Sequence, residues 1–98
     1  MFDKFNQKAR RAIFFARWEA GEFGGSAIES EHLLLGLLHE DKDLIGRVNA
    51  PTEQIREYIR ERRPLAKKVP TAQDMPFSEE CIRILKYAEN ELDRLSLH

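Results

Sequence analysis

The sequence predicts an all-α fold for one small domain of 98 residues. Apolar residues recur at intervals of three and four in several segments, which is the period of an α-helix. No run of useful length alternates apolar and polar residues as a β-strand does, and Pro and Gly separate the helical segments. A chain of this length supports a modest core, which argues against a large enzyme with a deep cleft.

The first helix is predicted over residues 6–23. Asn6 is a suitable N-cap and Gly24 a suitable stop. Phe14, Phe15 and Trp18 widen the apolar face and are interpreted as core, or as cover for a neighbouring helix. The face itself is formed by six residues: Ala9, Ala12, Ile13, Ala16, Ala20 and Phe23.

A second helix is predicted from Ser30 to about His39. Leucine occupies most of its circumference, so the helix is expected to be buried. We interpret Ser30 as its cap, because a serine hydroxyl can accept from backbone N–H groups of the first turn. Glu31 then lies favourably at the positive end of the helix dipole.

The rest of the chain is predicted to contain two more helices and a linker. One or two helical turns are expected over 43–48, and Ala50-Pro51-Thr52 indicates a break with Thr52 capping a helix over 53–62. Prolines punctuate residues 64–76, PLAKKVPTAQDMP, which predicts a linker. A last helix is predicted to open at Ser78.

A shift of 72 residues places the first helix on the last one, which indicates an internal repeat. Phe5 lands on Phe77 and Glu19 on Glu91. The alternative is that any two amphipathic helices can be superposed by choosing the shift. On the repeat interpretation the sequence stops within its second copy. The six apolar positions land on Cys81, Ile84, Leu85, Ala88, Leu92 and Leu95.

Charge and cysteine content limit the partners and the compartment. With 16 Lys and Arg against 17 Asp and Glu, the net charge is −1. No overall field therefore draws the chain to nucleic acid or to an anionic membrane. The single cysteine, Cys81, excludes an internal disulfide framework and fits a reducing compartment. With neither a secretory leader nor about 18 consecutive apolar residues visible, we expect a cytoplasmic protein without membrane association.

The stretch IESEHLLLGLLHE, residues 28–40, raises the question of a metal or catalytic site. His32 and His39 are about 10 Å apart along a helix axis, too far to share one metal ion. Ser30 and His32 at a helix start do not point at each other as a catalytic triad requires. A binding site is the interpretation that remains for this stretch. The N–H groups at the helix start and a serine hydroxyl can bind an anion, and a carboxylate alongside can bind a guanidinium.

A basic tract gives the second functional hypothesis, a small helical nucleic-acid-binding module. Acids at Glu53, Glu57 and Glu61 interleave with its first part, and only Tyr58 could stack on a base. We therefore favour a solvated helix face. The tract consists of Arg56, Arg60, Arg62, Arg63, Lys67 and Lys68.

Two further features of the sequence bear on its chemistry. Cys81 lies on the apolar stripe and is interpreted as an inert core residue. No Walker-type motif and no cofactor site is visible.

The sequence also resembles a known family. FNQKARRAIFFARWEAGEFGGSAIESEHLLLGLLHEDKDL resembles the first repeat of the Clp amino-terminal domain of ATP-dependent Clp (Hsp100) unfoldases, particularly the ClpC type. FSEECIRILKYAENELDRLSLH resembles the opening of that domain's second repeat. The most specific element is Ser-Glu-His-Leu-Leu-Leu-Gly-Leu, residues 30–37.

The resemblance implies an all-α bundle of two pseudo-repeats, with the second truncated after its first helix. Residues 1–63 would form the first four-helix repeat, 64–76 the linker and 77–98 the start of the second repeat. The family implies a non-catalytic domain that binds adaptor or substrate proteins and passes them to a Clp ATPase ring. In ClpC-type members this element helps to bind phosphorylated arginine, which makes Ser30 a candidate phosphate contact and Glu31 a candidate guanidinium contact.

Two features depart from the family pattern. The family commonly has glycine where this chain has Glu29, and an added carboxylate would repel a phosphate. The matching element of the second repeat is absent, so the last helix needs another cover for its apolar stripe. We expect a longer polypeptide, with a helix-swapped dimer as the second possibility.

Overall fold

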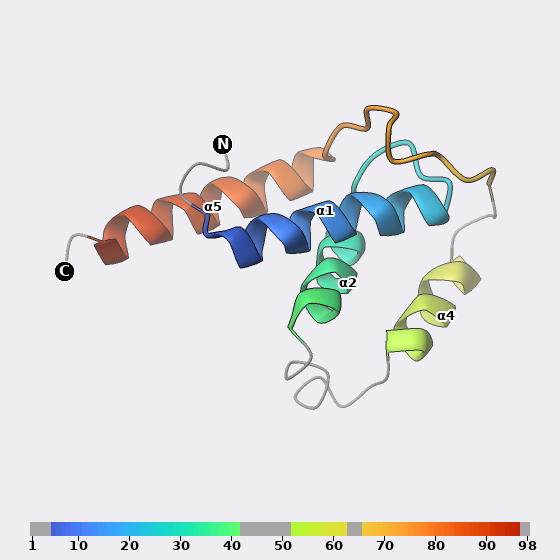
Figure 1. Cartoon of the computed structure of the whole chain (residues 1–98), viewed down its shortest axis with the longest axis horizontal. Coiled ribbons are helices and arrows are strands. Elements are labelled where there is room, and N and C mark those ends of the chain that lie inside the picture. Colours follow the sequence, from blue (N-terminus) through green and yellow to red (C-terminus); the bar gives the residue numbers. More distant parts are fainter. Residues whose placement is uncertain (1–4, 42–51, 63–65, 97–98) are drawn as a thin grey trace.

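The chain is all-α, as predicted. A computed structural model describes residues 5–41, 52–62 and 66–96. Within these ranges it contains no strand beyond one isolated bridge. The turns predicted over 43–48 lie outside the described residues. The helices of the described residues, shown in Figure 1, are α1 (Gln7–Glu22), α2 (Ser30–Glu40), α4 (Thr52–Arg62) and α5 (Glu79–Ser96).

Helix α1 begins and ends as the sequence predicts. The Asn6 side-chain Oδ1 accepts a hydrogen bond from the Ala9 N–H at 2.8 Å. At the other end Gly24 has a φ of +71°, which favours glycine because other residues are strained there. A Cβ at Gly24 would also come within 2.7 Å of Ala66. This residue therefore has to be glycine both to turn the chain and to let the linker pass.

Helix α2 packs closely on α1 because Gly36 carries no side chain. A Cβ at Gly36 would collide with the Ala12 carbonyl oxygen and would lie 2.8 Å from the Ala16 nitrogen. Ala12 and Ala16 are themselves buried, so small residues face one another across the contact. The carboxyl-terminal end of α2 is held to α1 by the ion pair between Arg11 and Glu40 at 2.7 Å. The buried side of α2 is completed by Leu35 and Leu38.

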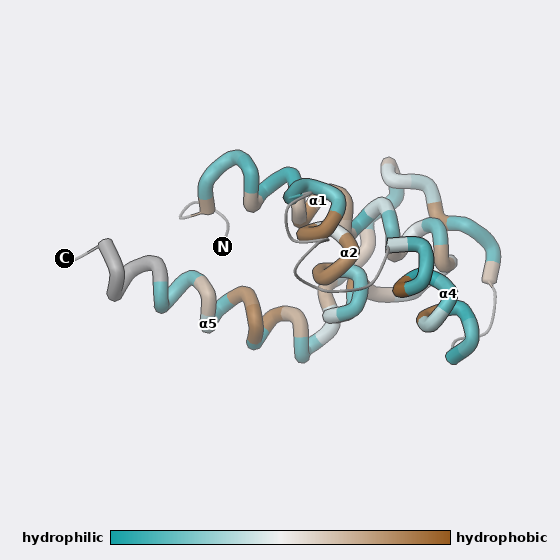
Figure 2. The backbone as a smooth tube through the Cα atoms, turned by 90° about the horizontal axis from the view of Figure 1, so that it is seen from below, coloured by the Kyte–Doolittle hydropathy of each residue, from teal (hydrophilic) through white to brown (hydrophobic). Residues whose placement is uncertain are grey.

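Helix α5 runs beside α1, and its carboxyl-terminal half extends past the start of α1 (Figures 1 and 2). Its amino end is tied to the loop before α2 by a parallel bridge between Ile28 and Phe77. The Ile28 N–H donates to the Pro76 carbonyl at 2.8 Å, and the Ser78 N–H donates to the Ile28 carbonyl at 3.0 Å. Cys81 and Leu85 anchor the helix in the core, at 0% and 6% exposure.

The starts of α1 and α5 are equivalent in the way that the 72-residue shift predicts. Ser78 Oγ accepts from the Cys81 N–H at 3.2 Å, as Asn6 Oδ1 accepts from the Ala9 N–H. Both pairs join an N-cap to the third residue of its helix. The cover over the two helices differs, because Ala12 is 4% exposed and its counterpart Ile84 is 44% exposed.

Helix α4 is held to the rest of the molecule by one apolar and one charged anchor. Ile59 is buried at 6% exposure, and the Arg56 guanidinium binds the carboxylate of Glu19 on α1, with Nη2 at 2.7 Å from Oε1. Thr52 is the first residue of α4 rather than the residue before it, a difference of one position. Residues 66–76 contain no helix, and residues 64 and 65 of the predicted linker lie outside the described residues.

No helix among the described residues is long and apolar enough to cross a membrane.

Candidate functional site

The amino end of α2 begins at Ser30, as predicted, but its N-cap is Glu29. The backbone at Glu29 is extended, with φ −97° and ψ 171°, and Ser30 already lies within the helix. The prediction that Ser30 caps the helix is therefore wrong. The Ile28 hydrogen bonds to Pro76 and Ser78 fix the chain in an extended form up to this point, which makes the next residue the cap.

His32 closes this helix end from the inside. Its side chain is 1% exposed, and its ring lies 5.8 Å from the ring of Phe23. The Nδ1 atom accepts a hydrogen bond from the Glu29 N–H at 2.9 Å, so the ring supports the N-cap. In this structure His32 therefore has a structural role.

Ser30 and Glu31 are half-buried, so this end of α2 reaches solvent. The hydrogen bonds of the helix begin with the N–H groups of His32 and Leu33, which both donate to the Glu29 carbonyl. The amides before them lie outside the helical ladder, where an anion can use them. Glu31 lies in the first turn, as the sequence predicts.

Carboxylates gather around this end of the helix. The pKa of the Cys81 thiol is raised, first by burial and then by the negative charges of Glu29, Glu80 and Glu31. Two of these acids belong to α2 or its cap and one to α5. This surrounding favours a cationic visitor and opposes an isolated anion.

An apolar groove of about 350 Å³ adjoins the same helix end. Ser30 lies on its border, and it runs between α1, α2 and α5. The sequence predicted that α2 is buried because leucine surrounds it. Leu35 and Leu38 are buried, but Leu34 and Leu37 line the groove and stay 40% and 47% exposed. The other lining residues are Phe5, Ala9, Ala12, Ile13, Leu33, Ile84, Leu85 and Ala88.

The second histidine of the stretch has a different environment. The His39 ring stacks on the Phe15 ring, with centroids 3.8 Å apart and planes 11° apart. Phe15 thus covers α2, as predicted, whereas Phe14 and Trp18 are 57% and 38% exposed rather than core. Within the described residues no three His, Cys, Asp or Glu side chains come together as metal ligands.

The basic tract is largely engaged in ion pairs. Arg56 is bound by Glu19 and Glu53, which raises the pKa of its guanidinium, chiefly through the hydrogen bond to Glu19. Arg60 pairs with Glu57. Arg62 lies near Glu61 and over the Tyr58 ring, and Lys68 lies 3.2 Å from Glu22. Acidic side chains thus accompany Arg56, Arg60, Arg62 and Lys68. Arg63 lies outside the described residues.

A chaperone domain of known structure has the same fold. In the crystal structure of the amino-terminal domain of the ClpD chaperone from Arabidopsis thaliana, the match covers 98% of this chain and 69% of that one. The TM-score is 0.81 and the sequence identity 31%. The likeness therefore extends over all the helices of the described residues.

Curated relatives give the same result. The chloroplastic chaperone protein ClpD2 of Oryza sativa subsp. japonica is 31% identical over 94 residues, and ClpD of Arabidopsis thaliana is 44% identical over 46 residues. The chain spans about a tenth or less of the length of these relatives. The model of the Clp repeat (R) N-terminal domain matches residues 4–96. The chain belongs to the Clp repeat N-terminal domain family.

Proposed function

We propose that this chain is a non-catalytic protein-binding domain that recruits adaptor or substrate proteins to a Clp ATPase. Family membership supports the general role, and the half-exposed start of α2 supports the place. The chain spans only a small part of the length of its curated relatives. The association with an ATPase ring is therefore part of what we propose.

Within this site, Glu31 is the contact for a guanidinium. Its carboxylate lies in the first turn of α2, and Glu29 and Glu80 add negative charge nearby. A guanidinium donates charge-assisted hydrogen bonds to a carboxylate, which gives direction as well as attraction. The observation that supports this role best is the group of carboxylates around an open helix start.

Ser30 is the contact for a phosphate if the guanidinium carries one. Its hydroxyl and the first amides of α2 are the donors that such a group needs. Glu29 opposes this contact, because its carboxylate adjoins the same helix start. We therefore expect arginine and phosphoarginine to bind with more similar affinities here than in a domain with glycine at this position.

The experiment titrates two short peptides, one with a central arginine and one with phosphoarginine, into isotopically labelled protein and follows amide chemical shifts. Glu31→Ala should abolish the shifts caused by both peptides while the spectrum of the folded domain persists. Glu57→Ala, an exposed acid on α4, is the matched control and should bind as the parent does. Unchanged titration of Glu31→Ala would remove Glu31 from the site.

A Glu29→Gly variant separates the two halves of the proposal. It should strengthen phosphoarginine binding and weaken arginine binding, because one carboxylate is lost beside the helix start. If both peptides respond equally to this change, the phosphate does not approach the amino end of α2.

Two further expectations belong to the same proposal. A helix-swapped dimer would exchange α5, and light scattering on the purified chain gives its mass directly. The cytoplasmic location stays a prediction, to be tested by fractionating cells that express the full-length protein.

A further inference from the structure

Two adjoining hollows lie at the carboxyl-terminal end of α1, and neither Ser30 nor Glu31 lines them. The first, of about 400 Å³, lies between α1 and α4. The second, of about 300 Å³, lies against residues 69–71 of the linker. Trp18, Glu22 and Lys68 line both, so the two hollows form one groove with these residues at the junction.

Trp18 is the apolar centre of this groove. The residue is 38% exposed, and its ring meets the edge of His39 at 6.4 Å and 75°. Phe23 lines the first hollow, and Val69 and Pro70 line the second. A large, half-exposed aromatic side chain between two apolar walls is the kind of anchor that dominates peptide and protein interfaces.

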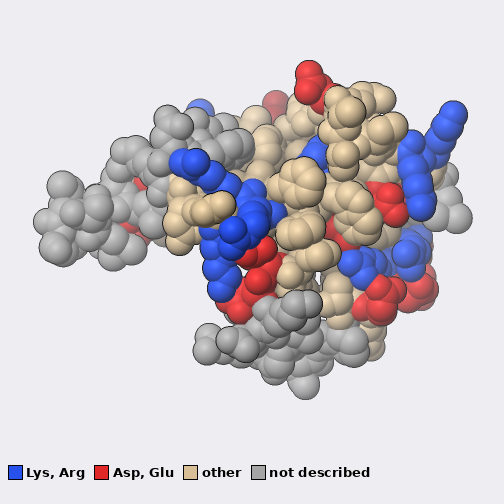
Figure 3. Space-filling model, in the orientation of Figure 1, with Lys and Arg blue, Asp and Glu red and all other residues tan. Residues whose placement is uncertain are grey.

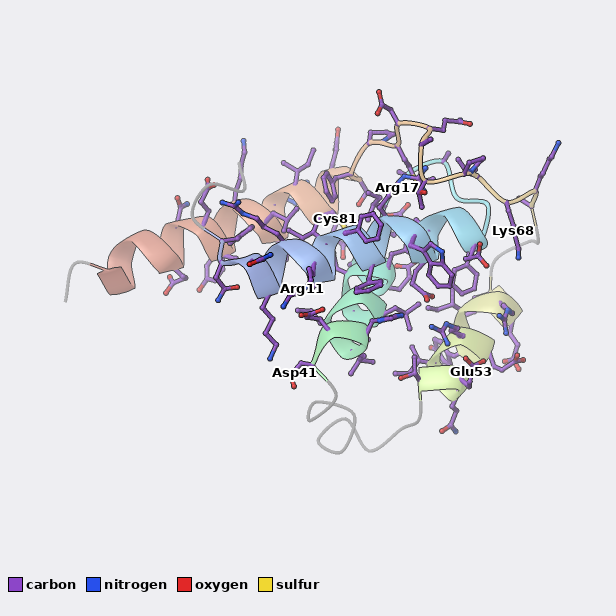
Figure 4. All side chains as sticks on the ribbon, in the orientation of Figure 1. Arg11, Arg17, Asp41, Glu53, Lys68 and Cys81 are labelled. Carbon is purple, nitrogen blue, oxygen red and sulfur yellow. The ribbon has the colours of Figure 1, made fainter. Side chains whose placement is uncertain are left out.

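The charges around the groove are paired with one another. Arg56 binds Glu19 and Glu53, and Lys68 lies 3.2 Å from Glu22. Positive and negative side chains around α4 and the neighbouring end of α1 are interleaved in Figure 3, and Figure 4 places Lys68 at this end of α1.

This charge balance decides the chemistry of the occupant. A charged side chain entering the first hollow would meet opposite charges that already have partners, and it would have to displace one of them. The ion pair of Glu19 and Arg56 is the hardest to displace, because Glu19 is 1% exposed and breaking a buried pair is strongly unfavourable. An uncharged segment can contact Trp18, Phe23 and Val69 without displacing any of these ion pairs.

We propose that the groove binds an extended, uncharged peptide segment of a partner protein, with an aromatic or proline residue stacked on Trp18. This inference rests on the proposed protein-binding function and adds a second surface, separate from Ser30 and Glu31. Proline-containing segments in extended form bind aromatic-lined grooves because little conformational entropy is lost.

The chain contains one tryptophan, so its own fluorescence reports the contact. The probe is the acetylated and amidated peptide Gly-Ser-Phe-Pro-Pro-Phe-Ser-Gly, titrated to millimolar concentration. Two further peptides replace both Phe residues by Glu or by Lys. Binding of the uncharged peptide should shift the emission to shorter wavelength, while the two charged peptides should leave it unchanged.

Variants then locate the contact by calorimetry. Trp18→Ala should weaken binding of the uncharged peptide at least about tenfold. Phe14→Ala removes a more exposed aromatic ring of the same helix that lines neither hollow, and should bind within about twofold of the parent. Thr71→Arg changes an exposed residue of the second hollow without touching the core, and it should also weaken binding. This variant provides the test if Trp18→Ala proves unstable.

The outcomes separate this inference from the first proposal. Glu31→Ala should still bind the uncharged peptide, and Trp18→Ala should still bind the arginine peptides. Tight, salt-sensitive binding of either charged peptide at Trp18 would overturn the uncharged class. No spectral change with any probe, or full binding by both Trp18→Ala and Thr71→Arg, would overturn the site.

Discussion

Replacing Arg56 by Met tests whether one buried ion pair holds α4 to the molecule. The Glu19 carboxylate is 1% exposed and receives hydrogen bonds from Arg56 Nε at 3.1 and 3.2 Å and from Nη2 at 2.7 Å. Met keeps much of the aliphatic volume but leaves the carboxylate buried without that partner.

The expected loss of stability follows from this burial. Removing one member of a buried pair costs about 3–5 kcal/mol. We expect the lower end, about 3 kcal/mol, because the Arg56 side chain is 18% exposed and water can reach part of the space. For a domain of this size that corresponds to a melting temperature lower by about 12 °C or more.

The assay is urea unfolding followed by Trp18 fluorescence and by far-ultraviolet circular dichroism. Hydrogen exchange should show the amides of α4 losing protection first, because Ile59 is then its remaining buried anchor.

Two controls identify the cause. Arg60→Met removes an exposed i,i+3 pair with Glu57 on the same helix and should cost under about 1 kcal/mol. The double change Glu19→Leu with Arg56→Met should recover most of the loss, since no buried charge then lacks a partner. An Arg56→Met variant within about 1 kcal/mol of the parent would refute the reasoning.

Three further changes give distinct results. Gly36→Ala should destabilise the fold by about 2–3 kcal/mol in urea unfolding, because its methyl meets the Ala12 carbonyl; an exposed helical glycine would instead gain stability. His32→Ala should cost about 2–4 kcal/mol through lost packing and the lost bond to Glu29, with His32→Gln recovering part as a second acceptor. Because burial raises the pKa of Cys81, its reaction with a disulfide reagent at pH 8 should be slow when folded and fast in urea. The unfolded chain ionises first, so the free energy of unfolding should fall as pH rises through the ordinary thiol pKa.

The helices and most of their ends could be predicted because their causes are local. Asn6 caps α1 through a residue three positions away, and the apolar period marks the buried face. Even the equivalence of the starts of α1 and α5 was visible as a shift of the sequence, since the two caps occupy matching positions.

The errors come from contacts between distant residues. Ser30 has the stronger local preference for a cap, but the hydrogen bonds of Ile28 to residues 76 and 78 place the last extended residue at Glu29. Arg56 looked like part of a solvated face because Glu19, its main partner, is 37 positions away. The aromatic residues of α1 gave no indication that Phe15 would pack on α2 while Phe14 and Trp18 stay exposed.

The bridge between Ile28 and Phe77 joins two parts of the chain mechanically. Ile28 stands two residues before the open end of α2, and Phe77 stands just ahead of α5. A pull on α5 must therefore either break the hydrogen bonds of Ile28 or drag the start of α2 along with it. The start of α2, where we propose that a partner docks, is thus joined directly to the segment that leads into α5.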